Sequence, residues 1–204
     1  TLIAFPNEWS IKSKKQEFRN LQPGETRRID FYFDEIEIKP GIKVMREGKT
    51  TYKPINAKIK GLKSDKDKLD SAKPGGSVAI MTGLDPSVTK TDSLVGQIAG
   101  IRGSLPEATY NITFTPKLFD KVITSSKNYP VKELMPNEPL MLIVNSLTTV
   151  GSVSKTNPRE TQVSIRRPVM AFEGDRVAIF RRFEGNKWRI IGHGIIKTGN
   201  KDNK

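Results

Sequence analysis

The stretch that decides the fold covers residues 34–59 and reads DEIEIKPGIKVMREGKTTYKPINAKI. Apolar and charged residues alternate in its first part, which is the two-residue period of a half-buried strand, and the alternation ends at the turn pair Pro40-Gly41. Glu47-Gly48-Lys49 predicts a hairpin tip, and residues 51–59 form the returning strand. Pro54 indicates an edge or a bulge in that strand.

The same pattern of short apolar runs and turns continues to the carboxyl end. Gly103-Ser104-Leu105-Pro106 is the best domain boundary, and one short helical turn is expected at residues 117–123. Closely spaced short strands with Gly/Pro turns are typical of an all-β sandwich or closed barrel. After the boundary, the strands are expected at residues 110–114, 140–144, 151–153, 161–165, 176–180 and 188–196.

Composition narrows the classes of partner. The 204 residues carry a formal net charge of +13 and no cysteine. Such an excess favours a polyanionic partner, most commonly RNA, although a basic but inert surface stays open. An anionic membrane is a weaker alternative because the sequence has no amphipathic basic helix, and no apolar run reaches transmembrane length. The absence of cysteine excludes disulfides and cysteine metal sites and is compatible with a reducing compartment.

No catalytic, cofactor or metal site is expected in this chain. The sequence contains no GxxxxGK[ST] phosphate loop. His193 is the single histidine and lies in an apolar strand between glycines, which favours a packing role over catalysis or zinc binding. Asp34 points to the opposite side of its strand from Glu35, so no carboxylate dyad is indicated there. The chain as given is therefore not expected to be an enzyme.

Three segments, in this order, resemble the gamma subunit of archaeal/eukaryotic translation initiation factor 2. They comprise residues 34–42 with 47–49 and 52–55; residues 72–76 with 83–92 and 94–96; and residues 166–169 with 174–179, 181–182 and 188–194. The Leu-Asp-Pro-Ser-x-Thr-Lys stretch at residues 84–90 separates this family from elongation factor Tu.

The resemblance implies two consecutive β-barrels, as in the second and third domains of translational GTPases. Residues 34–105 would form the second-domain-like barrel and residues 106–198 the third-domain-like barrel. Residues 1–33 depart from the family pattern and form an atypical segment in place of the first strands of the first barrel. Residues 199–204 are expected to be a polar tail.

The resemblance also implies a role in translation initiation. Such a subunit carries initiator methionyl-tRNA to the small ribosomal subunit in the cytoplasm, with GTP and Mg²⁺ expected only with the GTPase domain. The barrels would be a non-catalytic half that supplies docking surfaces. Further implied partners are the alpha and beta subunits of the same factor and an assembly chaperone, and no membrane.

Site residues follow from the same resemblance. The resemblance places a turn with Lys73, Gly75 and Gly76 near the acceptor end of the tRNA. The alternative is that this segment is an ordinary turn at the start of a strand. The alpha subunit would contact the hairpin with Lys43, Arg46 and Lys49, for which a solvated tip is the alternative.

In the third domain the implied RNA contacts are Arg166, Arg167, Arg181 and Arg182, near Trp188 in the sequence. Adjacent arginines on a strand point to opposite faces, so at most half of them share a surface. Salt bridges to Glu173 or Asp175 are the alternative.

Two other functions stay open on the sequence. One is a standalone basic β-barrel protein that binds RNA, such as a ribosomal protein. The other is the barrel pair of a different tRNA-carrying elongation factor, such as the selenocysteine-specific one.

Overall fold

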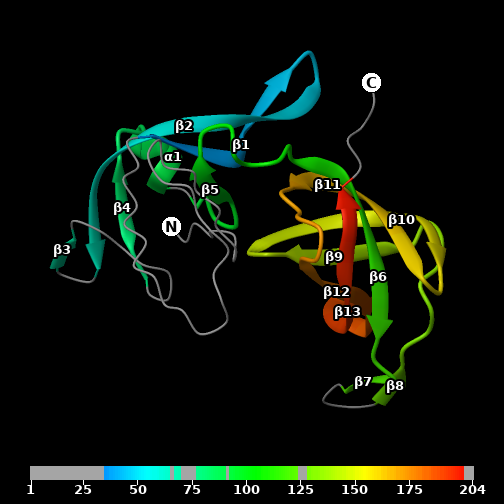
Figure 1. Cartoon of the computed structure of the whole chain (residues 1–204). Coiled ribbons are helices and arrows are strands. Elements are labelled where there is room, and N and C mark those ends of the chain that lie inside the picture. Colours follow the sequence, from blue (N-terminus) through cyan, green and yellow to red (C-terminus); the bar gives the residue numbers. More distant parts are fainter. Residues whose placement is uncertain (1–34, 65–66, 70–76, 91, 124–127, 200–204) are drawn as a thin grey trace, which may run out of the picture.

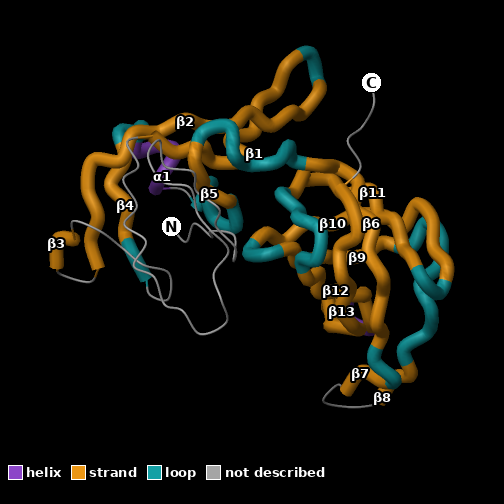
Figure 2. The backbone as a smooth tube through the Cα atoms, in the orientation of Figure 1, coloured by secondary structure: helices purple, strands orange, loops and turns teal. Residues whose placement is uncertain are grey.

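The computed structural model describes residues 35–64, 67–69, 77–90, 92–123 and 128–199. Its strands form an open five-stranded sheet, followed along the chain by a closed six-stranded barrel, with a separate two-stranded hairpin inserted after the first strand of the barrel. Figure 1 shows the two bodies side by side, joined by the segment between β5 (Ile98–Ile101) and β6 (Thr109–Leu118). The all-β prediction is confirmed, and strands dominate the trace in Figure 2.

The first body is built on a long antiparallel hairpin. Its strand order is β3-β2-β1-β5, with β4 also paired to β2. Ile36, Ile38, Ala57, Leu94 and Ala99 form its buried core. The prediction that residues 1–33 are atypical first strands lies outside the described residues, and the described strands alone form an open sheet. The elements are β1 (Glu35–Arg46), β2 (Lys49–Ser64), β3 (Asp67–Leu69), β4 (Ala79–Thr82), α1 (Pro86–Lys90) and β5 (Ile98–Ile101).

A bulge redirects strand β1 at the Pro-Gly pair. The prediction that the strand ends at Pro40-Gly41 is wrong, because β1 continues to Arg46. The register moves from Ile38 opposite Ile55 to Ile42 opposite Lys53, so three residues of β1 face Pro54 alone. The buried side-chain amide of Gln97 accepts from the Gly41 N–H at 2.8 Å and donates to the Gly41 carbonyl at 3.0 Å. A bulge beside Pro54 is therefore correct, and it makes the distal half of the hairpin a separate arm.

The second body is a barrel with strand order β10-β11-β6-β13-β12-β9, closed by the pairing of β9 with β10. Inward residues such as Phe114, Leu142 and Ile179 have no exposed surface, and full burial of such side chains stabilises the fold by about 1.5–3 kcal/mol each. Its strands are β6 (Thr109–Leu118), β9 (Pro139–Val144), β10 (Leu147–Asn157), β11 (Glu160–Val169), β12 (Arg176–Phe183) and β13 (Lys187–Gly199), and a 3-10 turn (Glu184–Asn186) joins the last two.

The helical turn expected at residues 117–123 is wrong. Strand β6 runs to Leu118, which pairs with Gly192 of β13, and the Phe119 N–H donates to the Ile191 carbonyl at 2.8 Å. Residues Lys121–Ile123 then form β7, which pairs with β8 (Asn128–Pro130). Pairing across the barrel satisfies the backbone here, so local propensity does not decide the conformation.

A small apolar cluster joins the two bodies. Ile98 of β5 and Leu105 of the connection are buried with Met170, and half-buried Phe172 packs against them. The turn before β5 also touches the barrel: a Cβ at Gly96 would lie 2.6 Å from the Ser146 carbonyl oxygen. This close approach requires glycine and holds the first body against the β9–β10 turn.

Candidate functional site

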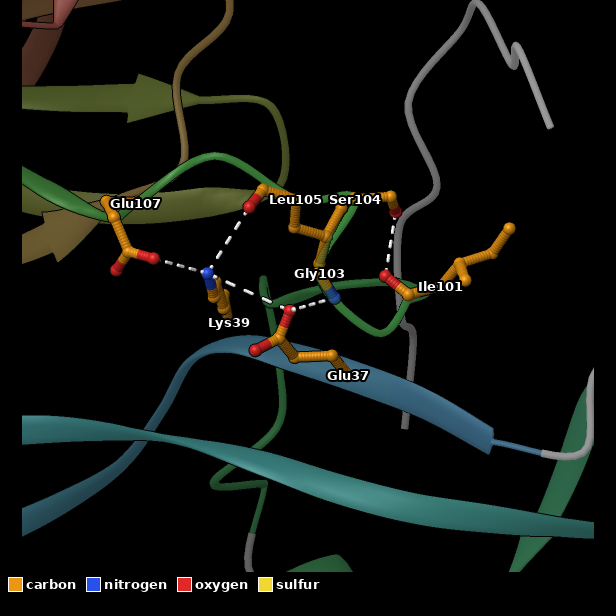
Figure 3. Close-up of polar contacts among 7 residues, drawn as sticks. All are labelled: Glu37, Lys39, Ile101, Gly103, Ser104, Leu105 and Glu107. Atoms are coloured by element: carbon orange, nitrogen blue, oxygen red, sulfur yellow. Dashed lines mark hydrogen bonds and ion pairs between the residues drawn. The ribbon is translucent and has the colours of Figure 1, made fainter. Parts of the chain in front are cut away.

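The connection between the bodies is fastened by a buried lysine (Figure 3). The Lys39 ammonium lies 2.8 Å from Glu107 Oε1 and 3.8 Å from Glu37 Oε2, and it donates to the Leu105 carbonyl at 3.3 Å. Its side chain is 5% exposed, whereas that of Glu107 is 77% exposed. The Gly103 N–H donates to Glu37 Oε2 at 3.2 Å. The strand that begins the arm therefore also fixes the connection to the barrel.

The arm comprises the distal part of the β1–β2 hairpin, residues 42–53. Figure 1 shows it projecting away from the sheet body. Lys43 lies opposite Tyr52 near its base, and Arg46 lies opposite Lys49 at its tip. All three basic residues are exposed, and Met45 beside them is 69% exposed. An apolar side chain among cations on a projecting hairpin is suited to contact with an anionic partner surface.

An open-sided cleft of about 430 Å³ lies between the base of the arm and the barrel. It is lined on the arm side by Lys43 and Tyr52, and on the barrel side by Arg167. Tyr52 approaches Tyr110 of the barrel: burial raises the pKa of Tyr110, and the nearby Tyr52 raises it further. The remaining lining residues are Gly41, Ile42, Ser87, Val88, Asp92 and Ser93.

The Leu-Asp-Pro-Ser stretch contributes its last residue, Ser87, to the lining of that cleft. Asp85 precedes α1, and its Oδ1 accepts from the Ser87 N–H at 2.7 Å, as an N-cap does. Hydrogen bonds from the Ser87 side chain and backbone hold the pKa of Asp85 below its usual value. Pro86 occupies the first helical position, where its missing N–H is not needed. The stretch that marks the family resemblance is thus a capped turn that presents Ser87 and Val88 to the cleft.

The first arginine pair divides as expected for a strand. Arg166 is exposed, whereas Arg167 is half-buried and lines the cleft. Within the described part of the chain, Arg167 Nε is buried and has no hydrogen-bond acceptor. The Arg167 backbone is fixed independently, because its carbonyl accepts from the Thr149 hydroxyl at 2.9 Å.

The second arginine pair divides in the same way. The Arg181 guanidinium is paired with the Glu138 carboxylate, and it donates to the carbonyls of Lys132 at 2.9 Å and Glu133 at 3.1 Å. Its partner is therefore Glu138 and neither Glu173 nor Asp175. Arg182 is exposed and lies 4.8 Å from the centre of the Trp188 ring. Arg167 thus shares a cleft with Lys43, while Arg181 is occupied by contacts within its own barrel.

Several other predicted residues remain to be placed. Lys73, Gly75 and Gly76 lie outside the described residues, so the predicted tRNA turn stays a prediction. His193 is half-buried in β13, with Phe119 at a ring-centroid distance of 6.5 Å. In the described ranges no three His, Asp or Glu side chains gather as a metal site, and the whole sequence lacks a phosphate loop.

The sequence reasoning missed Lys39, Tyr52 and Gln97 as residues that position the site. Tyr52 belongs to the hairpin expected to contact a partner, so its cleft position could have been guessed. Lys39 and Gln97 gave no signal, because their partners in the connection and at Gly41 lie between 56 and 68 residues away along the chain.

Comparison with known proteins adds a family relationship. A family described as "Initiation factor eIF2 gamma, C terminal" matches residues 110–196. Proteins named "Translation initiation factor 2 subunit gamma" are 43% identical over 165 residues in Methanosarcina mazei and 45% identical over 163 residues in Methanococcus vannielii. These matches cover 81% and 80% of this chain, but only 38% and 40% of the relatives' lengths. Within the described residues, no helix is long and apolar enough to cross a membrane.

Proposed function

Because this chain belongs to the family of translation initiation factor 2 gamma subunits, we propose that it forms the two-barrel, non-catalytic half of a GTP-dependent carrier of initiator methionyl-tRNA. The observation that carries the proposal is the extent of the match. It covers about four fifths of this chain at 42–45% identity in the methanogen relatives, more than the barrel region 110–196 alone.

In this proposal the barrels dock partners, and GTP binding belongs to a part of the factor outside this chain. The projecting arm is the contact for the alpha subunit, because it combines exposed cations with exposed Met45. Initiator methionyl-tRNA and the small ribosomal subunit are the RNA partners, which suits the net charge of +13. The beta subunit and an assembly chaperone complete the set of proposed partners.

Charge reversal at the tip of the arm tests the alpha-subunit contact. Arg46→Glu with Lys49→Glu should weaken binding of the purified alpha subunit about tenfold, because both cations are exposed and face each other across the hairpin. Isothermal titration calorimetry measures the effect. Unfolding of the variant should match the parent chain, since neither residue is buried.

The chain offers a matched control for this variant. Lys63 and Lys68 are also exposed and face each other across the β2–β3 hairpin. Their reversal removes the same charge and should leave alpha-subunit binding within twofold. An equal loss from both hairpins would indicate general electrostatic attraction and would refute the arm as the contact.

A further inference from the structure

The cleft between the arm and the barrel is lined by two cationic side chains and a tyrosine, and the proposed docking role does not account for them. We propose that it binds one nucleotide of a single-stranded RNA segment, with the phosphate on Arg167 and Lys43 and the base against Tyr52. The inference rests on the proposed function only in taking RNA as the partner.

Two cations from different bodies meet at this cleft. Lys43 comes from β1 and Arg167 from β11, and both line the same space. Arg167 Nε is buried without an acceptor among the described residues. A buried donor left unsatisfied is costly, and phosphate oxygens accept from guanidinium groups in the planar geometry that arginine presents. Because the Nε atom itself is buried, a phosphate in the cleft would bind the other N–H groups of the Arg167 guanidinium.

The size and the aromatic lining of the cleft suit a nucleotide. Its volume of about 430 Å³ falls within the range of small-ligand pockets. The Tyr52 side chain is half-buried at its edge. Bases of single strands stack on such rings with little sequence preference, while cations beside the ring follow the backbone.

Asp92 favours RNA over an acidic peptide as the occupant. It is exposed and lines the cleft together with Ser93. A carboxylate there repels peptide carboxylates and RNA phosphates alike, so its charge alone does not choose the occupant. The same carboxylate accepts a hydrogen bond from a ribose 2′-hydroxyl, which is a donor that RNA has and DNA lacks. The hydroxyl donor of the ribose is therefore the feature that favours a ribonucleotide over a polycarboxylate.

The test is fluorescence anisotropy of the full chain with fluorescein-labelled hexauridylate. Arg167→Gln should weaken binding about tenfold and lower the salt slope by about 0.7, the value for one phosphate contact on a single strand. Arg159→Gln is the matched control: it removes the same charge from an exposed position of the same barrel, in the turn between β10 and β11, and should change the affinity less than twofold. Tyr52→Leu should weaken binding several-fold with the salt slope unchanged.

Three results would overturn the inference. The first is no binding by the parent chain, and the second is an equal loss from Arg159→Gln and Arg167→Gln. The third is displacement of hexauridylate by hexaglutamate at similar concentrations, which would favour an acidic peptide. If the chain still binds the alpha subunit through the arm in any of these cases, only the inference that the cleft binds RNA is rejected, and the proposed function stands.

Discussion

Replacement of Gly41 by alanine should destabilise the first body by about 3 kcal/mol or more, the largest effect expected of any single change discussed for this chain. Gly41 has a backbone φ of +91°, a conformation that residues other than glycine rarely adopt. A Cβ there would lie 1.7 Å from the Lys53 carbonyl oxygen, so strands β1 and β2 would have to separate. The bulge that sets the direction of the arm would be lost with them.

Hydrogen exchange measures this effect locally. Amides of β1 and β2 should exchange about a hundredfold faster in Gly41→Ala, as a change of about 3 kcal/mol in local opening requires. Gly48→Ala is the control, because Gly48 also has a positive φ of +75° but a Cβ there meets nothing within 4 Å. It should cost about 1–2 kcal/mol and act only at the tip. Equal effects at both glycines would contradict the packing argument.

Replacement of Lys39 by methionine should destabilise the connection between the bodies by about 2 kcal/mol. Methionine keeps the length of the side chain but removes the ammonium that contacts Glu37, Glu107 and the Leu105 carbonyl. The Glu37 carboxylate, whose side chain is 12% exposed, would lose its cationic partner and keep only the hydrogen bond from the Gly103 amide. The exposed Glu107 contributes less, since solvent screens it.

Hydrogen exchange of the amides in residues 98–105 measures this destabilisation. A second substitution tests whether it comes from the unpaired Glu37 carboxylate. Lys39→Met with Glu37→Gln should recover part of the lost protection, because it removes the stranded carboxylate. Lys58→Met is the matched control: Lys58 pairs with Glu35 at 3.9 Å, both side chains are exposed, and its loss should cost less than about 0.5 kcal/mol. A loss at Lys58 equal to that at Lys39 would refute a role for burial.

The sequence predicted those features of the fold that short-range patterns determine. The alternation around Ile36 and the Glu47-Gly48-Lys49 tip specify a hairpin locally, and the structure has it. The Pro40-Gly41 pair was misread as the end of the strand because the amide that holds the bulge belongs to Gln97, 56 residues away. Local turn chemistry cannot reveal a partner at that distance.

The sequence predicted which types of residue form the candidate site, but it did not predict which of these side chains pair with each other or meet in space. Strand alternation correctly separates Arg166 from Arg167 and Arg181 from Arg182. Which arginine would be free depended on Glu138, which lies 43 residues from Arg181. The meeting of Lys43 with Arg167 depends on how the two bodies pack, and no local period encodes it.

The central claim is that these two bodies serve in translation initiation as the docking half of a tRNA carrier. The most direct test exchanges the corresponding barrels of the Methanococcus maripaludis gamma subunit, 45% identical to this chain, for residues 34–199. The same exchange with the barrels of the Methanosarcina mazei relative checks that the junction is tolerated. Filter binding should show GTP-dependent retention of initiator methionyl-tRNA over elongator tRNA by both chimeras. Retention by the Methanosarcina chimera alone, with this chain's barrels failing to discriminate, would contradict the claim.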